Sequence, residues 1–205
     1  MYIPKINLLD DKQEAIAFMQ RYSFATIVTV KDGIPTATHL PFVVSLRDNE
    51  LILTSHFAKP NPQADELLNG NPLVIFTEPH AYISPKHYES EQSVPTWNYI
   101  AVHAYGRATL IENLEEKTQL LEQTVRFYEN DYLKQWNSLS DDYKLKMMKG
   151  IVGFEIVVTG LQGKKKLSQN RSEIEKERII IDLDKSDDSA AKAIADYMRN
   201  TNPPV

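Results

Sequence analysis

The sequence predicts an α+β protein built around a mostly antiparallel sheet. Apolar segments rich in β-branched residues follow one another with short turns, and single helices are inserted between the later strands. About six or seven strands are expected, enough to close into a small barrel without exposed edges. The length of 205 residues suits one full domain with room for a small extension.

The first part of the chain predicts a helix followed by a β-meander. Asp10 or Asp11 caps a helix over 14–21, and Asp32-Gly33 is a two-residue hairpin signal. The expected strands cover 23–30, 35–45 and 51–55, with a turn at 47–49 between the last two.

The remaining elements alternate between strands and helices. Asn61 and Pro62 begin a short helix through 64–68, Asn113 begins a long one to about 128, and Ser140 begins another that ends at Gly150. Strands are expected at 73–77, 80–85, 102–111 and 151–161, with a polar surface loop over 86–94. We expect a domain over 1–172 and a charged helical extension over 173–205 packed on it, with its final helix near 188–199.

Composition restricts the possible partners. A net charge of −5 argues against a dedicated DNA-binding protein, because such proteins neutralise phosphates with a basic excess. The chain has no cysteine, which excludes disulfides and thiol chemistry. No apolar run approaches the length of a membrane span, and no secretory signal is evident, so we expect a cytoplasmic protein.

The segment 54–62 has the composition of an anion site. The hydroxyls of Thr54 and Ser55, the Lys59 ammonium and the free amides of the next helix can converge on a phosphate. The alternative is a polar connection that leaves Lys59 in solvent.

The segment 94–99 combines two large aromatic side chains with an amide. Trp97 and Tyr99 could cover a planar ring while Asn98 contacts its polar edge. The alternative is that Trp97 fills the core and Asn98 caps a turn.

A basic segment follows the last predicted strand. Lys164, Lys165 and Lys166 precede Ser168, two amides and Arg171, a density of hydrogen-bonding groups that exceeds the needs of a turn. The alternative is a solvated basic loop.

Several common kinds of site are not indicated. The five histidines form no metal-binding spacing, so we expect no metal site. No nucleophile elbow and no glycine-rich dinucleotide fingerprint is present, so we expect no catalytic nucleophile and no Rossmann site. Binding of flavin mononucleotide (FMN) is still possible, because FMN needs only one phosphate site and a slot for its ring.

Eight sequence blocks resemble the PaiB family of transcriptional regulators. In chain order they are Met-Tyr-Ile-Pro at 1–4, Ala-Thr-His-Leu-Pro at 37–41, Asn-Pro at 61–62, Pro-His-Ala-Tyr-Ile-Ser-Pro at 79–85, Val-Pro-Thr-Trp-Asn-Tyr at 94–99 with Val-His-Ala-Tyr-Gly at 102–106, Gly-Ile-Val-Gly-Phe-Glu at 150–155, and Lys-Leu-Ser-Gln-Asn-Arg-Ser at 166–172. They extend from residue 1 to about 172 and cover most of the chain.

The resemblance implies an FMN-binding split β-barrel, similar to pyridoxamine-phosphate-oxidase-like proteins, built as a homodimer with flavin at the subunit interface. It places Thr38, His39 and Leu40 on the flavin-facing strand. It places four further residues around the phosphate and ribityl chain: Ser55, His56, Lys59 and Asn61. The resemblance also implies that Trp97 and Asn98 approach the flavin from the second subunit. Three further residues complete the pocket: Lys166, Gln169 and Arg171. Lys59 stands where related proteins often have Arg, which keeps the charge but not bidentate phosphate geometry.

The function implied by the resemblance is negative regulation of protease synthesis and sporulation. Direct DNA binding is expected to be weak or to need a partner, because the chain is acidic and lacks a recognisable helix-turn-helix. A flavin reductase or oxidase is the main alternative, with the cofactor performing the redox chemistry. A haem-handling split barrel is a third possibility.

Overall fold

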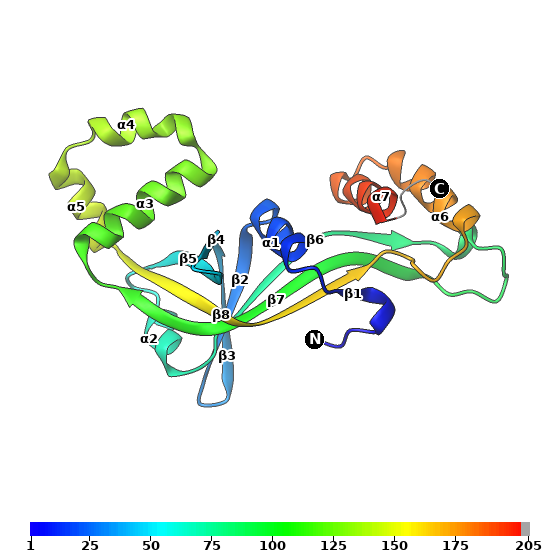
Figure 1. The fold of residues 1–205 in the computed structure, drawn as a ribbon, viewed down its shortest axis with the longest axis horizontal. Helices are drawn as coiled ribbons and strands as arrows, with labels where there is room; N and C mark the ends of the chain where they lie inside the picture. The colour runs from blue at the N-terminus through cyan, green and yellow to red at the C-terminus, as the bar shows by residue number, and fades with distance from the viewer. Residues whose placement is uncertain (202–205) are drawn as a thin grey trace. The chain divides into compact units, whose positions relative to one another are not determined.

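The computed structural model describes residues 1–201. Its strands are β1 (Leu8–Leu9), β2 (Phe24–Lys31), β3 (Ile34–Pro41), β4 (Val43–Arg47), β5 (Glu50–Ala58), β6 (Leu73–Ile83), β7 (Thr96–Ile111) and β8 (Ile151–Lys166). Its α-helices are α1 (Lys12–Arg21), α2 (Gln63–Glu66), α3 (Leu114–Tyr128), α4 (Leu133–Ser138), α5 (Asp141–Lys149), α6 (Glu173–Asp184) and α7 (Ser189–Thr201), with short 3₁₀ turns at Lys5–Asn7, Leu67–Asn69, Pro85–His87 and Asn130–Tyr132 (Figure 1).

The strands form one sheet in the order β3-β2-β6-β7-β8-β5-β4, with β1 paired to β8. The pairs β1–β8, β2–β3, β2–β6, β4–β5 and β5–β8 are all antiparallel. The predicted α+β class with a mostly antiparallel sheet is therefore confirmed. Within the described residues the sheet is not closed, because β3 and β4 stand at its two ends, as in a split barrel.

The chain divides into two compact units. Unit 1 contains Met1–Ala15, Thr77–Val102 and the chain from Gln162 onward, and unit 2 contains Ile16–Phe76 and His103–Leu161. The strands β6, β7 and β8 contribute residues to both units. The expected boundary at residue 172 stays a prediction, and residues 202–205 of the expected extension lie outside the described residues.

Four phenylalanines form the centre of unit 2. Phe42, Phe57, Phe76 and Phe154 are fully buried. The Phe57 and Phe154 rings stack with centroids 5.0 Å apart, and Phe42 meets Phe76 and Phe154 edge-on at 5.9 and 6.2 Å. Such aromatic contacts add to the burial of apolar area, so this cluster fixes the strands around it.

The hairpins of unit 2 form where the turn chemistry predicts them. Asp32 and Gly33 both have positive φ, which a two-residue hairpin between β2 and β3 requires. Asp48 and Asn49 form the second such turn, between β4 and β5. The predicted strand over 35–45 is two strands, and Phe42, the residue between them, donates its N–H to the Ser23 carbonyl.

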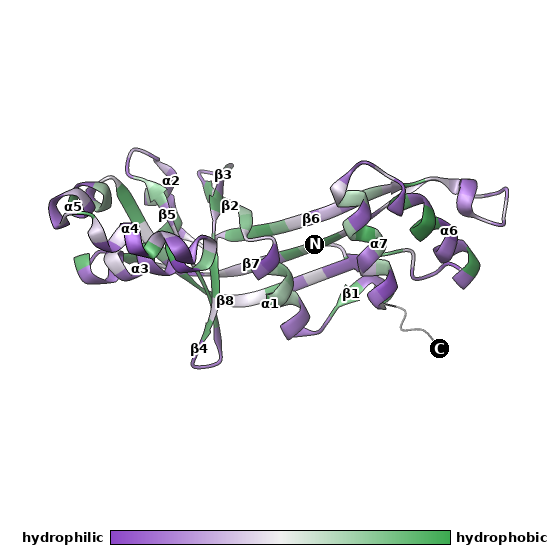
Figure 2. Cartoon of the chain, turned by 90° about the horizontal axis from the view of Figure 1, so that it is seen from above, coloured by the Kyte–Doolittle hydropathy of each residue, from purple (hydrophilic) through white to green (hydrophobic). Residues whose placement is uncertain are grey.

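The long helix of unit 2 begins at its predicted cap. The Asn113 side chain accepts the Glu115 N–H at 2.8 Å, and the Ser140 hydroxyl accepts the Tyr143 N–H at 3.3 Å where α5 begins. Between them the structure has α4, which the sequence pattern did not predict. Figure 2 shows that hydrophilic and hydrophobic residues mix along α3, α4 and α5, in contrast to the long hydrophobic stretches of β7.

Unit 1 combines strands with the helix pair α6 and α7, which lie side by side (Figure 1). A full capping box starts α6, because Ser172 and Glu175 each accept the other's backbone N–H. The core of the unit includes Ile83, Ile100, Ile179, Ile194 and Met198, all buried.

One expectation for unit 1 is wrong, and another is confirmed only in part. The basic run at 164–166 is not a loop, because β8 continues to Lys166 and pairs with β1 through Leu8–Lys164 and Leu9–Gly163. The segment 86–94 is not simply a polar surface loop, because His87 and Tyr88 are buried. His87 is held there by Asp182 of α6, whose carboxylate lies 3.2 Å from its Nε2.

Candidate functional site

Thr38 and Asn61 belong to a hydrogen-bonded network around Gln63 in unit 2. The Thr38 hydroxyl donates to Gln63 Oε1 at 2.6 Å, and Asn61 Nδ2 donates to Thr38 Oγ1 at 3.2 Å. Gln63 is fully buried and donates through Nε2 to the carbonyls of Ile27 and Thr36. These polar groups therefore hold β2, β3 and α2 together, and Gln63 is a residue that the sequence analysis missed.

The amides at the start of α2 are not free, contrary to expectation. The Gln63 N–H donates to Asn61 Oδ1, the Ala64 N–H to the Asn61 carbonyl, and the Asp65 N–H to the Pro62 carbonyl. Asn61 thus caps the turn as its residue type predicts. The helix contributes no open row of donors for a phosphate.

Ser55, His56 and Lys59 follow one another along β5 and its exit but have different environments. Ser55 is buried and donates to the Pro41 carbonyl at 2.7 Å. His56 is half-buried, and desolvation lowers its pKa, so the imidazole is neutral at pH 7. Lys59 is exposed, and its ammonium has no ion pair within residues 1–201. Of these three, Lys59 is the most accessible charge.

His39 and Leu40 lie on β3, next to β2. His39 is exposed and opposite Thr26 in the ladder, and its ring stacks on Phe24 at 6.3 Å. Leu40 is half-buried. The exposed rings of His39 and Phe24 give this side of the hairpin an aromatic surface.

Trp97 is exposed, so the alternative of a core tryptophan is wrong. Half of its surface is accessible, and its ring lies 5.8 Å from His80 and 5.8 Å from Tyr82. Tyr82 is itself 52% exposed. Large aromatic side chains left at the surface together commonly mark a binding surface, because their burial against a ligand is favourable.

Asn98, the next residue, is fully buried in unit 1. Its Oδ1 accepts from the Ser168 hydroxyl at 3.1 Å, and its Nδ2 contacts the Met198 sulfur at 3.5 Å. Ser168 has a φ of 60°, a conformation uncommon for a residue with a side chain. Asn98 therefore fixes the turn that follows β8, rather than capping a turn of its own.

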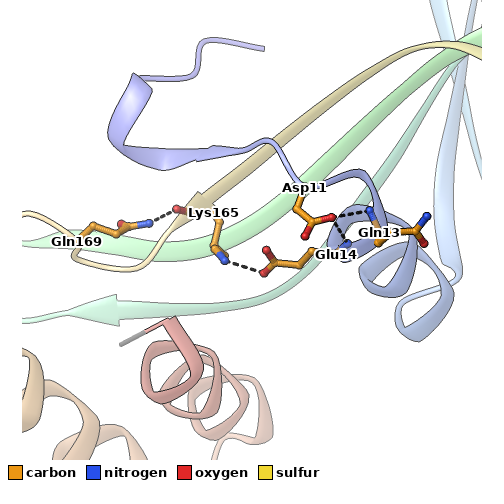
Figure 3. Close-up of polar contacts among 5 residues, drawn as sticks. All are labelled: Asp11, Gln13, Glu14, Lys165 and Gln169. Carbon is orange, nitrogen blue, oxygen red and sulfur yellow. Dashed lines mark hydrogen bonds and ion pairs between the residues drawn. The ribbon is translucent and has the colours of Figure 1, made fainter. Parts of the chain in front are cut away.

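Gln169 and Lys165 stabilise the same turn (Figure 3). Gln169 Oε1 accepts the Leu167 N–H at 2.8 Å, and its Nε2 donates to the Lys165 carbonyl. Lys165 forms an ion pair with Glu14 at 2.6 Å, and Asp11 caps α1 by accepting the N–H groups of Gln13 and Glu14. The Lys165 charge is thus already compensated.

Lys166 and Arg171 lie on a cavity of about 310 Å³ within unit 1. The Lys166 ammonium donates to Thr96 Oγ1, and desolvation lowers its pKa. The Arg171 guanidinium lies over the Tyr88 ring, 3.5 Å from its centroid. Gln169 and Ser168 also line this cavity. Tyr88 carried no signal in the sequence that separated it from an ordinary loop residue.

The predicted site residues therefore fall into two groups, each within one unit. Unit 2 holds Thr38, His39, Leu40, Ser55, His56, Lys59 and Asn61, and unit 1 holds Trp97, Asn98, Lys166, Gln169 and Arg171. Among residues 1–201, no three His, Asp or Glu side chains are arranged to hold a metal ion. No helix in that range has the length and hydrophobicity to cross a bilayer.

Comparison with known proteins identifies relatives of the whole chain. The family model described as "Putative FMN-binding domain" matches residues 1–160. The Bacillus subtilis "Protease synthase and sporulation protein PAI 2" is 41% identical over 204 residues, covering 98% of this chain and 97% of its own. An uncharacterised protein of Emericella nidulans is 29% identical, with 80% of each chain covered.

Solved structures show the same fold at lower identity. The flavocytochrome Anf3 of Azotobacter vinelandii has a TM-score of 0.61 at 15% identity, covering 76% of this chain and 67% of its own. The FAD and heme binding protein of Mycobacterium smegmatis has a TM-score of 0.60 at 16% identity, covering 76% and 71%. With the family match and the PAI 2 relative, the chain belongs to the PaiB family of FMN-binding split-barrel proteins.

Proposed function

We propose that this protein is a regulatory flavoprotein that binds FMN. The observation that carries the proposal is the exposed Trp97, which with Tyr82 and His80 provides an aromatic surface for a flat ring. The FMN-binding domain family over residues 1–160 supports the same cofactor. When bound, FMN would supply redox chemistry or serve as the sensed ligand.

The residues of the chain fit FMN in part. Cations for its phosphate are available at Lys59 in unit 2 and at Lys166 and Arg171 in unit 1. His39 and Leu40 would face the ring or ribityl chain, with His56 beside Lys59. Thr38, Ser55 and Asn61 already have hydrogen-bond partners in the protein, so we assign them a structural role within unit 2. Asn98 and Gln169 support the unit 1 turn in the same way.

A titration of flavin into the purified full-length protein tests the proposal. We expect bound FMN to lose fluorescence on stacking against Trp97, and Trp97→Ala to restore that fluorescence and weaken binding about tenfold. Tyr2→Ala is the matched control, because Tyr2 is an exposed aromatic residue of the same unit. Absence of FMN binding by the unmodified protein, or equal binding by Trp97→Ala, would contradict the proposal.

We infer further that the functional form is a homodimer. The outer face of β2 carries Phe24 and Val30, 68% and 61% exposed. An apolar sheet surface of this kind is unfavourable in water and suits burial against a second copy. We expect Val30→Glu to shift the mass measured by light scattering from dimer to monomer, while Val30→Thr leaves it unchanged.

The regulatory part of the proposal draws on the relative's name and on the charge of this chain. PAI 2 is named for protease synthesis and sporulation, and we propose that this chain acts negatively on the same processes. With a net charge of −5 we expect weak direct DNA binding. Tight, sequence-selective binding in a gel shift by the purified protein alone would overturn that expectation. Rapid anaerobic reduction of bound flavin by NADH or NADPH would instead favour a flavin oxidoreductase.

A further inference from the structure

The cavity beside Lys166 and Arg171 carries positive charge that the protein does not neutralise. Its lining comes from segments 4–7, 94–96 and 166–171, with Tyr88, and includes these two cations but no Asp or Glu. Within residues 1–201, no carboxylate oxygen lies within 4 Å of either cation. Both side chains are half-buried, so water still solvates their charges, and an anion entering the cavity would meet two cations with no competing carboxylate in the lining.

Glu175 is an acidic residue whose charge interacts with that of Arg171, but its carboxylate is bonded elsewhere. Its two carboxylate oxygens accept the Glu89 N–H at 2.9 Å and the Ser172 N–H at 3.1 Å. The hydrogen bond from the Glu89 N–H is the main cause that lowers the Glu175 pKa. The Ser172 N–H and the Arg171 charge lower it further, by smaller amounts. Glu175 therefore holds the start of α6 and does not occupy the cavity.

The cavity is held in shape before any ligand arrives. The turn from Leu167 to Arg171 is closed by the Gln169 side chain and by the bond from the Arg171 N–H to the Ser168 carbonyl at 3.0 Å. Asn98 anchors the Ser168 hydroxyl from β7. A preorganised site loses less conformational entropy on binding, so its groups contribute more of their interaction energy.

The polar groups present suit a phosphate monoester. The Lys166 ammonium and Arg171 guanidinium supply two positive charges, and Thr96 brings a hydroxyl beside the first. A phosphate monoester carries a charge of about −1.5 to −2 at pH 7, which matches two cations better than a single carboxylate does. Tyr88 adds a buried hydroxyl that has no partner among the described residues. A volume of about 310 Å³ suits a phosphate with a small organic group.

We propose that this cavity is a binding site for a phosphate monoester, held by Lys166 and Arg171. The phosphate could belong to FMN or to a different phosphorylated small molecule, and both sources use the same chemistry. The proposal does not depend on flavin binding, because the two cations, the hydroxyl and the turn lie within unit 1.

Inorganic phosphate is the probe, added to the flavin-free full-length chain at constant ionic strength with chloride as the reference anion. We expect phosphate at about ten times its dissociation constant to raise the melting temperature by roughly 3–6 °C. Lys166→Met and Arg171→Gln should each weaken phosphate binding about tenfold or more, since each removes a charge-assisted contact. Arg171→Lys should retain part of the affinity.

Two controls locate the site. Lys192→Met removes an exposed lysine on α7 of the same unit, and Lys134→Ala removes an exposed lysine on α4 of unit 2. Both variants should bind phosphate as the unmodified protein does. If either cavity variant fails to fold by circular dichroism, the other still provides the comparison, and ³¹P line broadening on the unmodified protein measures binding directly.

Competition identifies the source of the phosphate. If saturation with FMN abolishes the effect of inorganic phosphate while riboflavin does not, the flavin phosphate occupies the cavity. If neither FMN nor riboflavin changes the effect of inorganic phosphate, a different phosphorylated ligand occupies the cavity. Both of these results support the site. The proposal is overturned if phosphate has no effect on the unmodified protein, or if its effect persists in both cavity variants.

Discussion

The two groups of predicted site residues differ in how far the protein itself satisfies them. In unit 2, Thr38, Asn61 and Gln63 bond to one another and to the backbone, and the amides at the start of α2 have partners. In unit 1, Lys166 and Arg171 line a cavity without a carboxylate partner among residues 1–201. The hydroxyl and amide groups of unit 2 are thus structural, whereas the two cations that line the unit 1 cavity have no carboxylate partner.

The comparison shows that a polar group without a partner inside the protein indicates a binding site better than its residue type does. Ser55 and Thr38 have the hydroxyls that a phosphate site needs, yet each donates its proton inside unit 2. A buried polar group must find a partner, and within a fold the partner is usually the backbone or a neighbouring side chain. The same rule makes an unpaired cation in a cavity informative.

The largest expected effect comes from the network of unit 2. Gln63→Leu would leave the Ile27 and Thr36 carbonyls and the Thr38 hydroxyl without their partner, so we expect a loss of about 3 kcal/mol in the free energy of unfolding. Urea denaturation measures it. Gln123→Leu on the exposed face of α3 is the control, with a change below about 0.5 kcal/mol. Equal effects would show that the network is not stabilising.

The next effect tests whether unit 1 also has a structural polar group. Asn98→Leu removes the partner of the buried Ser168 hydroxyl, and we expect a loss of about 2 kcal/mol in the free energy of unfolding. Phosphate binding should weaken as well, because the turn before Arg171 loses its anchor. Retained phosphate affinity in a stable Asn98→Leu variant would mean that the turn holds its shape by itself.

Acidification should cause a smaller loss in the free energy of unfolding, and the size of this loss should differ between the two units. Burial lowers the pKa of both His56 and His87, so the unfolded chain binds protons first as the pH falls below about 6.5, and stability declines with pH through that window. The Asp182 carboxylate opposes the decrease in the pKa of His87, whereas desolvation alone acts on the pKa of His56. We therefore expect His56→Gln to reduce the acid sensitivity of unfolding more than His87→Gln does. The reverse order would contradict this assignment.

The smallest effects are expected at the open cations. Arg171→Gln and Lys59→Ala should change the free energy of unfolding by less than about 0.5 kcal/mol, because neither side chain has an ion pair within residues 1–201. A cost above about 2 kcal/mol for Arg171→Gln would reveal a structural role and remove the contrast between the units.

Local sequence chemistry predicted many of the elements. Asp32-Gly33, the Asn113 cap, and the start and end of α5 at Ser140 and Gly150 are all where their backbone preferences place them. These features depend on neighbours within a few residues, so they can be predicted without the fold. The length of β8 could not, because Gly163 and Lys164 pair with Leu9 and Leu8 of β1, about 155 residues earlier in the chain.

The amino-acid sequence alone determined the α+β class, the positions of most turns and helix caps, and, through its motif blocks, membership of the PaiB family. Only the tertiary structure decided that Trp97 is exposed, that Thr38 and Asn61 are held by a buried glutamine, and that Lys166 and Arg171 share a cavity. The physical reason is that caps and turns arise from local backbone geometry. Whether a polar or aromatic side chain is satisfied, buried or open depends on residues far away in the chain.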